Sequence, residues 1–147
     1  MKINLGSGNR PLTGWLNIDC QERVNPDLCH DILEGLPFED SSVDEVRAFD
    51  FLEHMPIGKQ IFVVTEIWRV LKKGGRFEHF TPSTDGRGAF CDPTHQSFWN
   101  ILSWLYYTDD QHRALYGIEA KFKVEMLRDV LTGDHIIHTH GIMYAEK

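Results

Sequence analysis

Short apolar runs, each ending at a glycine or an acidic residue, fill much of the first fifty residues of the chain. They cover residues 2–5, 15–19, 28–31 and 43–50, with turn-forming residues between them. Runs of this length, bounded by Gly, Pro, Asn and Asp, are typical of strands. A longer segment at 57–71 repeats its apolar residues at helical spacing instead. Strands that alternate with a helix in this way predict an α/β fold.

The segment 57–71 carries the clearest helical pattern in the sequence. Its periodic apolar residues are Ile57, Ile61, Val64, Trp68 and Leu71. Gly74 and Gly75 follow where a left-handed C-terminal cap belongs, so we expect them to end the helix. Residues 76–80 then predict a fifth strand, which Thr81 and Pro82 stop.

The C-terminal third predicts an aromatic helix and a hairpin. Aromatic residues crowd the segment 98–107, for which we expect a helix. Apolar residues alternate with charged ones over 122–126, a turn follows at 132–134, and 135–145 reads as another strand. The sequence therefore predicts an antiparallel hairpin that closes the sheet.

The connections between the early strands are too short for ordinary covering helices. Only residues 6–14 separate the first two strands, and only 20–27 separate the next two. Parallel strands are normally joined by crossovers of a dozen or more residues, with both faces of the sheet covered. We therefore expect part of one face to lack helices, and to be shielded by the aromatic segment or by a second subunit in a homodimer.

Length and composition limit the classes of protein to consider. A chain of 147 residues is the size of one domain, which we take to span 1–147. The formal charge of −7 disfavours nucleic-acid binding, because binders of nucleic acid neutralise phosphates with positive charge. The longest apolar stretches, such as 61–64, are too short to cross a membrane. Three cysteines without framework spacing favour a reducing compartment, so the cytoplasm is the expected location.

The glycine turn Gly6-Ser7-Gly8 directly follows the first strand. Glycines at this place allow a tight turn and let a ligand approach the backbone. A dinucleotide site would need a third glycine at position 11 and an acidic residue about 20 residues further on. The chain has Pro11, and Asp19 comes much sooner, so an NAD site is disfavoured.

Two acidic residues end neighbouring strands beside this turn. Asp19 closes the second strand, and its carboxylate would accept hydrogen bonds from both hydroxyls of a ribose. Asp31 closes the third strand and places a second acceptor nearby for an exocyclic amine. Together, the turn and the two carboxylates predict a site for a nucleoside.

At this point the sequence resembles a known family over nearly its whole length. The class I methyltransferases that use S-adenosylmethionine (SAM) are similar in five stretches and in the same order: LGSG at 5–8, NID at 17–19, DILEGLPFEDSSVDEV at 31–46, FLEHM at 51–55 and WRVLKKGG at 68–75. The resemblance implies a Rossmann-like mixed sheet of about seven strands, mostly parallel, with an antiparallel C-terminal hairpin and reduced helices in the N-terminal half. It also implies SAM as the cofactor and transfer of its methyl group to an acceptor, which we expect to be a small molecule.

The resemblance also assigns roles to residues. The positions that would bind the cofactor are Gly6, Ser7, Gly8, Asp19, Cys20, Asp31, Ile32, Asp50 and Phe51. Within that set, the glycine turn would hold the methionine part, Asp19 the ribose, and Asp31 with Ile32 the adenine. His54 is similar to a family position close to the active site.

The acceptor side of the site is predicted from chemistry. If the acceptor is a hydroxyl or a protonated amine, a base must take its proton, and histidine is suited to this at neutral pH. The candidates for this catalytic role are His95 and His54. His95 belongs to the segment 91–95, which either faces the substrate or is a loop in which Asp92 caps the next helix.

Aromatic and histidine residues leave two further interpretations open. Six aromatic side chains would form either an apolar acceptor pocket or part of the core: Phe90, Phe98, Trp99, Trp104, Tyr106 and Tyr107. Several histidines invite a metal interpretation, in the pairs Cys29/His30 and Cys91/His95 and in the group His135, His138 and His140. None has the repeated short spacing of a structural zinc site, so no metal is predicted.

Alternative functions share the same fold. An aminopropyl transferase or an NAD-dependent reductase would also bind a nucleoside cofactor, although Pro11 and the early Asp19 argue against NAD. A non-catalytic relative that acts as an interaction partner is also open, because the polar pair Glu78-His79 lies inside the expected fifth strand.

Overall fold

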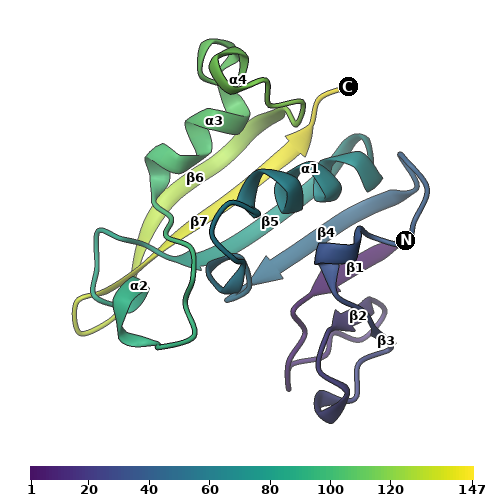
Figure 1. The fold of residues 1–147 in the computed structure, drawn as a ribbon, viewed down its shortest axis with the longest axis horizontal. Helices are drawn as coiled ribbons and strands as arrows, with labels where there is room; N and C mark the ends of the chain where they lie inside the picture. The colour runs from purple at the N-terminus through teal and green to yellow at the C-terminus, as the bar shows by residue number, and fades with distance from the viewer.

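The computed structural model describes residues 1–147 and contains one seven-stranded sheet (Figure 1). The strands are β1 Lys2–Leu5, β2 Leu16–Asp19, β3 Leu28–Cys29, β4 Val43–Phe49, β5 Leu71–Pro82, β6 Phe122–Gly133 and β7 Ile136–Ala145. Their order across the sheet is β3-β2-β1-β4-β5-β7-β6. Strands β1 to β5 are all parallel to one another, and β7 runs antiparallel to both β5 and β6. The predicted mixed α/β sheet with a C-terminal hairpin is confirmed.

Regular helices occur only after the fourth strand. They are α1 Gln60–Val70, α2 Gly88–Cys91, α3 Leu105–Thr108 and α4 Asp110–Tyr116. Short 3₁₀ turns supply the rest: η1 Glu22–Val24, η2 Ile32–Glu34, η3 Leu52–His54 and η4 Ile101–Trp104. The expected reduction of helices in the N-terminal half is confirmed, because only η1, η2 and η3 precede α1. No helix is both long and apolar enough to cross a membrane.

Two sequence predictions about helix ends and lengths were wrong. Helix α1 ends at Val70, and Gly74 and Gly75 lie inside β5 instead of capping the helix. The pairing of β4 with β5 is irregular there, and Gly74 has a φ of +73° that suits an irregular strand as well as a helix cap. The aromatic segment 98–107 does not form one helix, since Asn100 caps a separate 3₁₀ turn that leads into the short α3.

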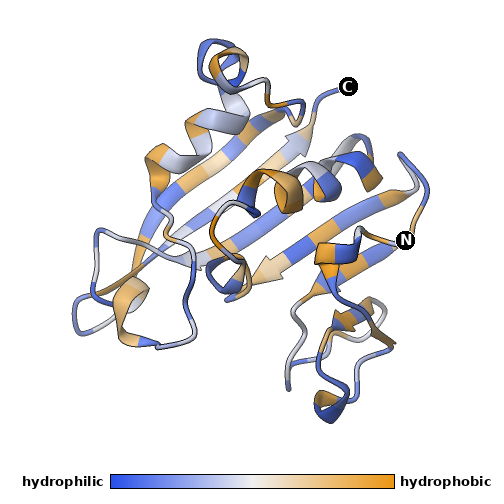
Figure 2. Cartoon of the chain, in the orientation of Figure 1, coloured by the Kyte–Doolittle hydropathy of each residue, from blue (hydrophilic) through white to orange (hydrophobic).

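The two faces of the sheet differ sharply. Helices α1 and α3 lie on the same face (Figure 1), where alternate residues of the central strands are buried, among them Val46, Phe77 and Met143. Hydrophilic residues alternate with apolar ones along β4 and β5 (Figure 2), and in this alternation Glu45, Arg76 and Glu78 point to the opposite face. Parallel strands are usually covered on both faces, and here the second face has no helix.

The aromatic segment does not shield the open face, contrary to one of the two expectations. Trp104 stacks on His79 at 3.9 Å between ring centroids and also meets Phe77, so the segment packs on the face that α1 covers. The open face instead carries linked ion pairs. Arg76 meets both Glu45 and Glu78 there. The other expectation, a second subunit on this face, stays a prediction.

Candidate active site

The residues predicted to bind the cofactor lie along one edge of the sheet. Strands β3, β2, β1 and β4 are adjacent and parallel, so their carboxyl ends meet at this edge. Gly6 follows β1, Asp19 ends β2, Asp31 follows β3 and Asp50 follows β4. The strand order reverses between β1 and β4, and open α/β sheets bind ligands at such a point.

The glycine turn has the conformation of a ligand-binding loop. Gly6 and Gly8 have φ values of +63° and +47°, which side-chain-bearing residues rarely adopt. A Cβ atom on Gly6 would lie 2.4 Å from the ring of Phe51, so glycine lets the turn pack against the loop after β4. Gly8 has no atom within 4 Å of its Cβ position, and a ligand can therefore approach its backbone. Ser7 between them is buried, and its hydroxyl has no hydrogen-bond partner.

The Asp19 carboxylate is held in place by the backbone. The backbone N–H of Gly8 donates to one of its oxygens and that of Gln21 to the other, each at 2.9 Å. A carboxylate has about four acceptor positions, so two remain for a ligand. The geometry fits the predicted role as an acceptor for two ribose hydroxyls.

Asp31, Ile32 and Cys20 complete the β2–β3 end of the edge. Asp31 caps the η2 turn by accepting from the Leu33 backbone N–H at 2.9 Å, and its second oxygen has no partner in the chain. Ile32 is buried in the core. Cys20 is exposed beside both carboxylates, and partial burial together with their charges raises the pKa of its thiol.

Asp50 has an unusual backbone conformation. Its φ is +48°, although it is not a glycine, and strain of this kind often marks functional sites. Its carboxylate lies 3.3 Å from Nε2 of His138 and 3.9 Å from Arg10. The side chain thus links the glycine loop, the end of β4 and the strand β7.

The two predicted catalytic histidines lie together, although they are 41 positions apart in the sequence. The rings of His54 and His95 are 5.1 Å apart and meet edge to face. The backbone N–H groups of Gln96 and Ser97 both donate to the carbonyl of Glu53, which ties the η3 turn to the loop that carries His95. Because η3 directly follows β4, this contact places the histidine pair near the carboxyl end of β4.

Sequence reasoning missed Glu53, the residue between Leu52 and His54. Its side chain is almost completely buried, and neither carboxylate oxygen has a hydrogen-bond partner. Burial raises the pKa of Glu53 to about 8, and the charges of Asp50 and Asp92 add to the rise. The signal was present in the sequence as an acidic residue directly after the apolar pair Phe51-Leu52.

Asp92 does not cap the next helix, contrary to that alternative. It follows α2, and one of its oxygens accepts from both the backbone N–H and the hydroxyl of Thr94. These hydrogen bonds lower the pKa of Asp92. The segment 91–95 is therefore a turn stabilised by Asp92, and it places His95 with its Nδ1 at 2.9 Å from the carbonyl of Ala89.

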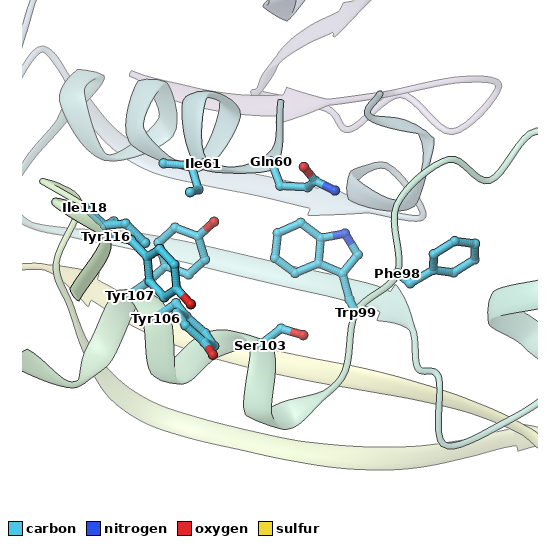
Figure 3. A pocket seen from close by; sticks show the side chains of 9 residues that line it. All are labelled: Gln60, Ile61, Phe98, Trp99, Ser103, Tyr106, Tyr107, Tyr116 and Ile118. Carbon is cyan, nitrogen blue, oxygen red and sulfur yellow. The ribbon is translucent and has the colours of Figure 1, made fainter. Parts of the chain in front are cut away.

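An aromatic pocket of about 300 Å³ lies between α1 and the aromatic segment (Figure 3). Gln60 and Ile61 form one wall from α1, and the other residues come from the segment 98–118. Of the six aromatic residues singled out in the sequence, four line the pocket: Phe98, Trp99, Tyr106 and Tyr107. Trp104 is core, and Phe90 is exposed, where it stacks on Phe98.

Comparison with known proteins agrees with this fold. Residues 13–78 match a family model described as a methyltransferase domain. A SAM-dependent methyltransferase from Methanosarcina mazei is similar over 99% of this chain and 92% of its own, with 17% identity and a TM-score of 0.67. A comparison of the sequence with curated proteins gives no match.

Two other solved structures show what the fold can support. The 1,6-didemethyltoxoflavin-N1-methyltransferase of Burkholderia thailandensis, solved with its namesake compound and S-adenosylhomocysteine, is 14% identical, with a TM-score of 0.67 over 99% of this chain and 71% of its own. The [4+2]-cyclase SpnF is 15% identical, with a TM-score of 0.71 over 99% of this chain and 75% of its own. The second likeness shows that the fold alone does not fix the reaction. Residues 13–78 thus match a methyltransferase-domain model, and the whole chain shares the fold of solved SAM-dependent methyltransferases.

Proposed function

We propose that this chain transfers a methyl group from SAM to a small-molecule acceptor, and that residues 1–147 work as one catalytic domain. The observation that carries the proposal is the meeting of the glycine turn, Asp19, Asp31 and Asp50 at the carboxyl edge of four adjacent strands. When bound, SAM supplies a methyl group that is already activated as a sulfonium. The protein then has to hold the cofactor, align the acceptor and exclude water.

The cofactor edge offers matched partners for each part of SAM. Asp19 keeps two acceptor positions for the ribose hydroxyls, and Asp31 keeps one oxygen for the adenine amine. The hydroxyl of Ser7 and the open backbone of Gly8 provide polar groups for the methionine part. The ring of Phe51 packs against the glycine turn, and the buried Ile32 would support the adenine end of the site from the core side. Cys20 lies beside Asp19 and lines the same edge.

The aromatic pocket is the proposed acceptor site. Seven of its nine lining residues are hydrophobic, which favours an acceptor with a flat or apolar body. Ser103 and the tyrosine hydroxyls add polar groups that would orient it (Figure 3). The pocket and the histidine pair share one connecting segment, because His95 lies only three residues before Phe98.

His54 and His95 are proposed to assist removal of the acceptor's proton. Exchange of His95 for alanine should lower turnover on an identified acceptor by about a hundredfold or more, as is usual for a general base. The dissociation constant for S-adenosylhomocysteine should stay unchanged, because His95 lies outside the cofactor edge. Unchanged turnover in this variant contradicts the proposed role.

Calorimetry on the purified chain tests the cofactor assignment. We expect SAM and S-adenosylhomocysteine to bind and NAD to show no binding. The Asp19→Ala variant should bind S-adenosylhomocysteine at least tenfold more weakly, since it loses hydrogen bonds between ribose and a charged group. The matched control is Asp134→Ala, which removes an exposed carboxylate at the β6–β7 turn and should bind like the wild type. Absence of binding at millimolar ligand would overturn the proposal in favour of a non-catalytic relative.

A further inference from the structure

Three potential metal ligands come together beside the aromatic loop. One ligand atom each from Glu53, His54 and His95 lies within 4.8 Å of the other two. The side chain of Glu53 is 2% exposed, that of His95 6% and that of His54 37%. Glu53 and His95 are therefore buried, and solvent reaches the group at His54.

The hydrogen bonds around the two histidines fix which nitrogen is free. Nδ1 of His95 lies 2.9 Å from the carbonyl of Ala89, which can only accept, so Nδ1 carries the proton. The hydroxyl of Thr94 donates to Asp92 at 2.7 Å, and its oxygen then accepts from Nδ1 of His54 at 3.2 Å. In the neutral form of each ring, Nε2 is then the nitrogen with the lone pair that can bind a metal.

This arrangement has the features of a prepared metal site. Histidines that bind metals commonly donate their other ring N–H to a carbonyl or to a polar group that is itself held in place. The Ala89 carbonyl plays this part for His95, and the pair Thr94 and Asp92 plays it for His54. Nε2 of His54 lies 3.9 Å from Oε1 of Glu53.

The buried Glu53 carboxylate is the second, independent observation. Neither of its oxygens has a hydrogen-bond partner, and buried polar groups in folded proteins nearly always have one. A cation bound to the carboxylate would satisfy both the charge and the empty acceptor positions. The backbone of Phe51 and of Glu53 itself lies near these oxygens and lowers the pKa somewhat, but no hydrogen bond of ordinary geometry forms.

We propose that Glu53, His54 and His95 bind one divalent transition-metal ion, with Zn²⁺ the best match. Two imidazoles and one carboxylate form the ligand set of open zinc sites, in which a fourth position remains for water or substrate. In a tetrahedral site the ligand atoms are about 3.3 Å apart. The accessible His54 side chain can close the remaining gap by rotation. Only the use of the ion in catalysis rests on the proposed function: as ligands, the histidines would then act on the acceptor through the ion and not as free bases.

A cobalt titration tests the site directly. The untagged full chain is treated with a chelator, and CoCl₂ is added while the visible absorption of the bound ion is recorded. We expect one Co²⁺ per chain, displaced by Zn²⁺. His95→Ala and Glu53→Gln should each lower the affinity at least tenfold, whereas His135→Ala, which removes an exposed histidine of the β6–β7 turn, should leave it unchanged.

Two further measurements keep the outcome clear. His54→Ala removes the most exposed ligand, so it should fold normally and still lose the cobalt spectrum. Calorimetry with S-adenosylhomocysteine on the same metal-free samples reports the cofactor site separately. Cofactor binding without saturable cobalt binding overturns the metal proposal alone, as does a cobalt spectrum that survives in both His54→Ala and His95→Ala. Cobalt binding without cofactor binding overturns only the proposed function.

Discussion

The two faces of the sheet differ in how they are shielded from water: one is covered by helices and aromatic residues, and the other carries ion pairs. On the covered face, Phe77 and His79 lie under Trp104, with α1 and the aromatic segment sealing the layer from water. On the open face, Glu78 of the same strand pairs with Arg76 at 2.9 Å and with His140 at 2.8 Å. Successive residues of β5 therefore face opposite environments.

This difference explains the polar pair Glu78-His79 in a central strand. Glu78 lies on the open face, where Arg76 and His140 are its partners. His79 is fully buried, and neither ring nitrogen has a partner, so it serves as a flat ring that stacks on Trp104. The polar pair is thus explained by a sheet with one solvent-exposed face. It is no argument that the chain is a non-catalytic relative.

The largest contrast between the faces should appear on exchange of Trp104 for alanine. The side chain is completely buried and contacts four other rings, so its loss should cost about 3–5 kcal/mol of unfolding free energy. Urea unfolding followed by circular dichroism measures the change. Phe90→Ala is the matched control, since Phe90 is 63% exposed, and it should cost well under half as much. Equal losses in both variants would mean that the aromatic layer is not the core.

The buried His79 should make the protein sensitive to acid. Burial, and then the charge of His140 on the adjacent strand, lower its pKa well below the usual value. The unfolded chain takes up this proton near pH 6.5 and the folded chain does not, so stability is lost as the pH falls below that value. The loss approaches about 1.4 kcal/mol per pH unit.

The variant His79→Phe keeps the stacked ring and removes the titration. Its unfolding free energy should fall less between pH 7 and pH 5 than that of the wild type, whereas the exposed control His135→Ala should follow the wild type. If His79→Phe and wild type lose stability in parallel, the acid sensitivity arises elsewhere.

The open face should show the smallest effect. Burial raises the pKa of Glu78, but hydrogen bonds from His140 and Arg76 outweigh this and lower it overall. Because these pairs are reached by solvent, Glu78→Gln should cost about 1 kcal/mol or less, and the cost should shrink in 1 M salt. The control Glu34→Gln removes a carboxylate without an ion pair. A salt-independent loss of several kcal/mol would show that the face is covered in solution, as a homodimer would cover it.

The cofactor edge could be predicted from the sequence because its residues follow strands directly. Gly6, Asp19 and Asp31 each end a short apolar run, and parallel strands bring their ends together. The Glu53, His54 and His95 group could not be predicted in this way. Its members come from two loops about 40 residues apart, and tertiary hydrogen bonds join these loops, among them those from Gln96 and Ser97 to the Glu53 carbonyl.

The errors in the predicted elements also have local causes. A glycine pair after a helical pattern is typical of a cap, yet the same residues suit an irregular strand. Pairing of Leu71 and Arg76 with β4, on either side of the glycines, decides between the two. The aromatic segment has helical spacing, but the extended Trp99 pairs with Ser83 and Asn100 starts a new turn, so the helix is broken.

A crystal structure of the chain with S-adenosylhomocysteine tests the central claim most directly. We expect the nucleoside at the carboxyl edge between β1 and β4, with both ribose hydroxyls donating to Asp19 and the adenine amine near Asp31. The sulfur should lie on the side of the edge that faces His54 and His95. A ligand bound elsewhere, or a ribose without contact to Asp19, would contradict the account.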